Sequence, residues 1–98
     1  CQRQQGLQYT TQIPENFIVL FKKISGLQFF HTQNCRFPID ILSLDSSGVV
    51  LSIWTVDPEQ NLVGPTPIGT QAVLESHAGW AIKNSIKVGD NLSFLVKE

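Results

Sequence analysis

The sequence predicts an α+β domain that is mainly β, folded as a compact β-sandwich or small barrel with two or three short helices. Short runs of aromatic and β-branched residues are separated by glycine, proline and asparagine, a pattern typical of several short strands joined by turns. Hydrophobic residues make up 42% of the chain and charged residues 15%, which favours a folded core over disorder. The length of 98 residues suits one domain, which we expect to span residues 1–98.

The first third of the chain predicts one helix, one loop and two strands. Proline and glycine mark the breaks between these segments, and a run of aromatic and β-branched residues marks the first strand. In chain order the predicted segments are residues 2–8 (helix), 9–16 (loop), 17–21 (buried strand), 25–26 (turn) and 27–32 (strand).

The clearest local prediction is a β-hairpin with arms at residues 39–44 and 49–56 and a turn between them. Asp45 stands at the first turn position, where its carboxylate can accept hydrogen bonds from the backbone that follows. Gly48 stands at the last position, where a positive φ costs little.

Alternation along the first arm places Asp40 on the same face as Leu42 and Leu44. A carboxylate on an apolar face is costly unless it is paired or hydrogen-bonded. We therefore expect Asp40 to have a partner, and the preferred one is Arg36, either directly or together with Glu75.

The second half of the chain predicts a long loop, two strands and a short helix. Three prolines and two glycines mark the loop, which is near the length at which loops are usually functional or mobile. The helix is expected to have Ser76 as its N-cap and Asn84 as a left-handed C-cap. The predicted segments are residues 57–70 (loop), 71–74 (strand), 77–84 (helix), 87–90 (turn) and 91–96 (strand).

Composition and charge argue against two classes of function. The net charge is −1, and the seven basic residues are scattered, whereas non-specific nucleic-acid binding needs a basic stripe. The longest apolar run, residues 17–21, is far shorter than the ~20 residues of a membrane-spanning helix. The chain contains no methionine, so we expect a trimmed N-terminus. Cys1 and Cys35 allow one disulfide, but their spacing does not favour it over a free, buried Cys35.

Most side chains able to do chemistry lie in residues 31–45 and 72–80. A shallow cleft there would be lined by the predicted ligand-binding residues His31, Arg36, Asp40, Glu75 and Trp80. The acid–base set of His31, Asp40, Glu75 and His77 is also the only set suited to a metal, but its spacing is a weak signal. We therefore assign no catalytic residue, metal ligand or cofactor.

The aromatic and sulfur-bearing residues add two weaker hypotheses. Trp54 and Trp80, with several phenylalanines, are candidates for the walls of a small-ligand or sugar pocket, although packing in the core is the stronger interpretation for the phenylalanines. Trp80 is expected to be half exposed on its short helix. Cys35 and His31 resemble a nucleophile and base in composition only, because no orienting third group or oxyanion hole is evident.

Five short motifs, in the same order, resemble the family of domains of unknown function numbered 192. The central motif matches a family variant that reads His-Thr, two variable residues and then Met-Arg-Phe-Pro-Ile-Asp, with Cys35 in place of the Met. The motifs are Gly6-Leu7-Gln8; Ile13-Pro14 with Val19-Leu20-Phe21; His31-Thr32 with Arg36-Phe37-Pro38-Ile39-Asp40; Leu74-Glu75 with Ala78-Gly79; and Gly89-Asp90.

This resemblance implies a prokaryotic, compact β-sandwich or barrel without an established activity, cofactor or substrate. Because methionine cannot act as a nucleophile, it also excludes a family-wide mechanism through Cys35. Family members usually have another strand before the first helix, which further supports a trimmed N-terminus here.

We therefore expect a soluble, uncharacterised small binding or accessory domain rather than an enzyme, with a small molecule or a protein as its partner. Two alternatives remain open. One is an enzyme of the hydrolase or lyase type that uses His31 with Asp40 or Glu75. The other is a structural or protein-interaction domain that forms a homodimer through a sheet edge. The sequence does not decide between the cytoplasm and an extracytoplasmic compartment.

Overall fold

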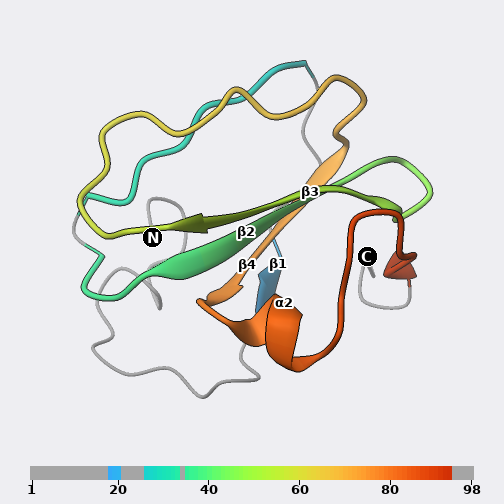
Figure 1. Ribbon diagram of the computed structural model, residues 1–98. Coiled ribbons are helices and arrows are strands. Elements are labelled where there is room, and N and C mark those ends of the chain that lie inside the picture. Colours follow the sequence, from blue (N-terminus) through green and yellow to red (C-terminus); the bar gives the residue numbers. More distant parts are fainter. Residues whose placement is uncertain (1–17, 21–25, 34, 94–98) are drawn as a thin grey trace.

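A four-stranded antiparallel sheet forms the framework of the protein in a computed structural model that describes residues 18–20, 26–33 and 35–93 (Figure 1). The strands follow the order β1-β4-β2-β3, so β2 and β4 are central. The prediction of an α+β domain that is mainly β is confirmed. The predicted helix 2–8 and loop 9–16 lie outside the described residues. The strands are β1 (Ile18–Leu20), β2 (Ile39–Leu44), β3 (Val50–Val56) and β4 (Ala72–His77).

The predicted hairpin is confirmed as β2 and β3. Asp45 Oδ1 accepts hydrogen bonds from the backbone N–H groups of Ser47, at 2.8 Å, and Val49, at 2.9 Å. Gly48 has a φ of 88°, which a residue with a side chain rarely adopts. The turn chemistry therefore sets the register of the hairpin, apart from a shift between Ser43 and Leu44.

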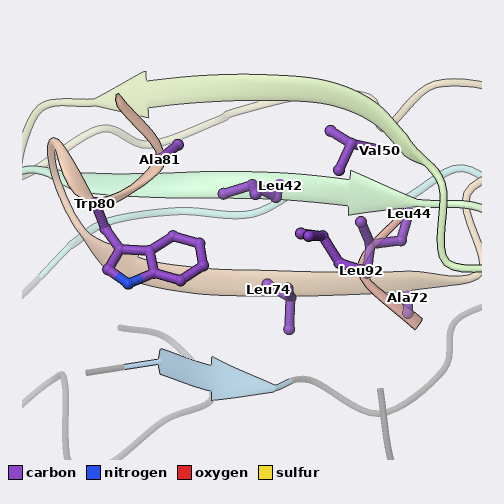
Figure 2. Packing of buried hydrophobic residues seen from close by; sticks show 8 residues of the cluster. All are labelled: Leu42, Leu44, Val50, Ala72, Leu74, Trp80, Ala81 and Leu92. Atoms are coloured by element: carbon purple, nitrogen blue, oxygen red, sulfur yellow. The ribbon is translucent and has the colours of Figure 1, made fainter. Parts of the chain in front are cut away.

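The two faces of the sheet carry separate apolar clusters. On one face, Ile39 and Ile41 of β2 are fully buried against side chains from the loops. On the other face, Leu42 and Leu44 pack with residues of β4 and with Trp80 and Leu92, as Figure 2 shows. Full burial of a side chain of this size contributes roughly 1.5–3 kcal/mol, so both clusters hold the sheet in place. The first cluster is completed by Phe30, Cys35, Phe37, Val56 and Val73, and the second by Val50, Ala72, Leu74 and Ala81.

A pair of loop segments, residues 26–33 and 57–66, packs on the first face through Phe30 and Val63, and we call it the covering ribbon. Its traces run beside each other in cyan and yellow in Figure 1. Phe30 and Val63 form a β-bridge with two backbone hydrogen bonds of 2.8 Å. The predicted strand 27–32 is thus reduced to one bridge. The partner loop contains Pro65, which has no N–H to continue a ladder.

The chain after β4 differs most from the prediction. β4 extends to His77, because the central strand β2 pairs with it as far as Ile39. Ser76 therefore lies within a strand, and its prediction as a helix N-cap was wrong. Helix α2 (Trp80–Lys83) begins later and follows Gly79, which has a φ of 93°.

The end of α2 also departs from the prediction. Asn84 is the C-cap, but its φ is −99°, and the left-handed conformation falls on Ser85, with a φ of 59°. The predicted last strand is a single bridge between Asn91 and Val49, and its residues from 94 onward lie outside the described part.

Cys35 is 2% exposed and is disulfide-bonded, so the interpretation as a free thiol was wrong. Among the described residues, no helix combines the length and apolar character that crossing a bilayer requires.

Candidate functional site

Asp40, one of the five predicted binding residues, accepts three hydrogen bonds through its side chain. It is 1% exposed, and the three donors are 15, 39 and 41 positions away in the sequence. Oδ1 accepts a hydrogen bond of 2.7 Å from Thr55 Oγ1 on the neighbouring strand β3. Oδ2 accepts from the backbone N–H groups of Gly79 and Ala81, each at 3.1 Å.

Asp40 therefore caps the N-terminus of α2, although it is distant from this helix in the sequence. The first N–H groups of a helix have no partner within the helix, and α2 has no side-chain cap of its own. The expectation that Asp40 needs a partner was therefore sound, but Arg36 does not provide it. Arg36 is exposed and forms no ion pair within the part of the chain that the structure describes.

Glu75 lies on the opposite face of the sheet from Asp40. It pairs with Ile41 across β2 and β4, and residues 40 and 41 point to opposite sides of their strand. Its side chain is completely buried. The structure therefore does not gather Arg36, Asp40 and Glu75 into one polar cluster, because the sheet separates the two carboxylates.

The two histidines occupy separate places at the edge of the first face. His31 lies in the covering ribbon, where its Nδ1 accepts a hydrogen bond of 3.3 Å from the backbone N–H of Gln33. His77 ends β4, and its ring stacks on Phe37 with centroids 5.9 Å apart. In the described residues, no group of three or more His, Cys, Asp or Glu side chains is arranged to hold a metal ion.

The hydrogen bonds of Asp40 bear on the enzyme hypothesis. Both of its oxygens are engaged by Thr55 and by backbone amides, none of which is an imidazole. A general base must lie within hydrogen-bond reach of the proton that it abstracts, directly or through one water. In this geometry Asp40 positions a helix and does not orient His31.

The two tryptophans lie on opposite faces of the sheet. Trp54 packs against the cluster around Ile41, and Trp80 packs with Leu42 and Leu74 (Figure 2). They therefore do not wall one pocket together. Trp80 is 7% exposed, so the expectation of a half-exposed ring was wrong.

Trp80 nevertheless lines an open recess of about 490 Å³ at the C-terminal end of α2. Trp80, Ile86 and Leu92 supply its apolar part, and four exposed polar residues complete its lining. The recess is lined by Trp80, Asn84, Ser85, Ile86, Asp90, Asn91 and Leu92. Sequence reasoning assigned Asn84 to a helix end and Asp90 to a turn, and it did not bring them together. The only feature of the sequence that points to this recess is the enrichment of Asn, Asp and Ser between residues 84 and 93.

Hydrogen bonds within the protein fix the polar side chains of this recess. Asn84 Nδ2 donates to the carbonyl of Trp80 at 2.8 Å, and Asp90 Oδ2 accepts from the N–H of Lys87 at 2.8 Å. Asn91 donates to the carbonyl of Ser47 at 3.2 Å and accepts from the N–H of Ser93 at 2.8 Å. Within the described chain, Asn84 Oδ1, Asp90 Oδ1 and Ser85 Oγ form no hydrogen bond. The oxygens of Asn84 and Asp90 are therefore held in position with acceptor capacity to spare, and Ser85 Oγ is free to donate and accept.

The family model of DUF192, described as "Uncharacterized ACR", matches residues 1–94. Two solved structures are also similar. One is a protein of unknown function from Novosphingobium aromaticivorans DSM 12444, with 27% identity and a TM-score of 0.78, covering 89% of this chain. The other is from Sinorhizobium meliloti 1021 and is described as a "putative transcription regulator", with 26% identity and a TM-score of 0.73, covering 92% of this chain.

This chain spans 64% of the length of the Novosphingobium protein and 71% of the Sinorhizobium protein. No curated protein matches it.

Proposed function

The chain belongs to the uncharacterised family DUF192, and we propose from its own geometry that it is a binding module for a small, neutral, hydroxylated molecule of the sugar or polyol class. The observation that supports this proposal is the recess beside Trp80, where an apolar wall adjoins side-chain oxygens that the protein does not use. Small-molecule sites commonly combine a mostly apolar, concave lining with a few fixed polar groups.

The polar groups favour a ligand that donates several hydrogen bonds. Asn84 Oδ1 and Asp90 Oδ1 are acceptors, and Ser85 Oγ both donates and accepts. Adjacent hydroxyl groups of a sugar or polyol match this set. The carbon skeleton of the same molecule would rest on Ile86 and on the accessible part of Trp80.

Among the five residues predicted to bind a ligand, only Trp80 contributes to the recess. The binding roles of His31, Arg36, Asp40 and Glu75 remain predictions outside this proposal. A protein partner, including a second copy of the chain, is a separate proposal that rests on the sheet edge.

Titration of the purified chain with neutral monosaccharides and polyols, followed by two-dimensional NMR, tests the proposed function. We expect a saturable shift of the Trp80 indole signal and of backbone signals from residues 84–92. Asp90→Asn should weaken binding about tenfold, because a carboxylate accepts a stronger hydrogen bond than an amide does.

Asp45→Asn is the matched control. Asp45 also accepts backbone hydrogen bonds in a turn, but it lies in the hairpin and does not line the recess. Binding should therefore be unchanged in this variant. Shifts elsewhere in the chain, or equal affinities for Asp90→Asn and Asp45→Asn, would contradict the proposal.

A further inference from the structure

Strand β3 forms one outer edge of the described sheet, and its outer side is open along most of its length. On that side, Val50 donates to the carbonyl of Asp90 and accepts from the N–H of Gly89, each at 2.8 Å. Beyond their pairing with β2, residues 51–56 form no backbone hydrogen bond within the described chain. Backbone groups of an antiparallel strand alternate in direction, so this stretch presents unpaired N–H and C=O groups outward.

The sequence of β3 lacks most of the devices that usually protect such an edge. Val-Leu-Ser-Ile-Trp-Thr-Val contains no charged residue and no proline, and its register shift lies near one end, opposite Leu44. Residues 51–54 are partly exposed and Thr55 is exposed, so side chains of this strand remain accessible. Natural edge strands are usually short, charged, interrupted or covered, because an open edge is a template for another strand.

We propose that β3 pairs antiparallel with β3 of a second copy, which joins the two sheets across a twofold axis. Such an interface is formed by the same surface on both copies. Centred on Ile53, the pairing places Ser52 opposite Trp54 and Leu51 opposite Thr55, so no like charges meet. The net charge of −1 adds little repulsion between copies. This proposal does not depend on the ligand proposed for the recess.

The absence of charge on β3 is what favours a second copy as the occupant. If the partner strand carried charged side chains, these would lie beside the β-branched and aromatic side chains of β3, which provide no opposite charge. A second β3 supplies β-branched and aromatic side chains, which suit cross-strand pairs.

Sedimentation equilibrium of the chain over about a hundredfold range of concentration tests this proposal, since dimer formation follows mass action. The informative variant is Thr55→Lys, which introduces a charge at the exposed position of the edge. Thr55→Val is its matched control, because both variants remove the hydroxyl that donates to Asp40 and only the lysine adds a charge. We expect the wild-type chain and Thr55→Val to dimerise with rising concentration and Thr55→Lys to remain monomeric.

Hydrogen exchange of the wild-type chain provides a second test that needs no variant. Amide exchange in residues 51–56 should slow with rising concentration, while exchange in the central strand β2 should not change. A monomer at every concentration, dimerisation of Thr55→Lys equal to that of the wild type, or concentration-independent exchange in β3 would overturn the proposal.

Discussion

The carboxylate of Asp40 and the backbone N–H of Ala81 form a hydrogen bond of 3.1 Å that spans 41 positions of the sequence. It ties the central strand β2 to the start of α2, and the N–H of Gly79 binds the same oxygen. Because α2 comprises four residues and has no local cap, its position depends on this carboxylate. Asp40 therefore connects the sheet to the helix whose C-terminal end lines the recess.

Replacing Asp40 with alanine should lower the free energy of unfolding by about 3 kcal/mol. Hydrogen bonds to a charged group contribute roughly 1.5–3 kcal/mol each. The donors of the exposed residues Thr55 and Gly79 can bond to water after the truncation, so the main loss comes from the buried N–H of Ala81. Urea unfolding measures the change. Asp45→Ala is the control, because Asp45 is less buried and also accepts backbone hydrogen bonds, and its loss should cost about 1 kcal/mol. Equal costs for the two variants would contradict the special role of Asp40.

Gly48→Ala should destabilise the protein more than Gly89→Ala does. Both glycines have a positive φ, of 88° and 98°, so alanine is strained at either position. A Cβ at Gly48 would lie 2.7 Å from Ser93 Cα, whereas one at Gly89 meets nothing within 4 Å. Overpacking against backbone typically adds about 1–3 kcal/mol, so thermal unfolding should separate the variants by at least about 1 kcal/mol. Equal unfolding midpoints for the two variants would mean that Ser93 can move away from a Cβ at position 48 at little energetic cost.

Thr32→Val should loosen the covering ribbon with little change in side-chain volume. Thr32 Oγ1 donates to the carbonyl of Asp57 at 2.8 Å and accepts from the N–H of Gln60 at 2.7 Å. Valine would leave both groups without this partner, and we expect a loss of about 2 kcal/mol and faster exchange of the Gln60 amide. Thr70→Val removes one local hydrogen bond, to Pro67, and should cost less. An unchanged exchange rate at Gln60 would contradict this role.

Local rules predict the β2–β3 hairpin well because its determinants are adjacent in the sequence. Asp45 and Gly48 specify the turn, and two-residue alternation places Asp40 beside Leu42 on one face. The same alternation implies that a carboxylate on that face requires a partner. It does not identify the partner, because the choice among Arg36, Thr55 and the start of a distant helix depends on packing.

Predictions for the chain after residue 70 fail where pairing overrides local propensity. Ser76 resembles a helix cap, but a ladder with β2 continues through it, and backbone pairing in a central strand outweighs one capping hydrogen bond. Residues 27–32 resemble a strand, yet their partner is a proline-containing loop that allows only one bridge. Whether Ser76 and residues 27–32 take part in a β-ladder therefore depends on which segment of the chain lies beside them.

The candidate site shows the same division between local and tertiary information. By itself the sequence determined the mainly β class, the hairpin, the face that Asp40 occupies and the family to which the chain belongs, because these depend on near neighbours and on ordered motifs. Only the tertiary structure separated Asp40 from Glu75 across the sheet, and only it brought Trp80, Asn84 and Asp90 around one recess. The physical reason is that the alternation of neighbouring residues decides on which face of the sheet a side chain lies. Which other side chains pack against it there depends on how segments distant in the sequence come together.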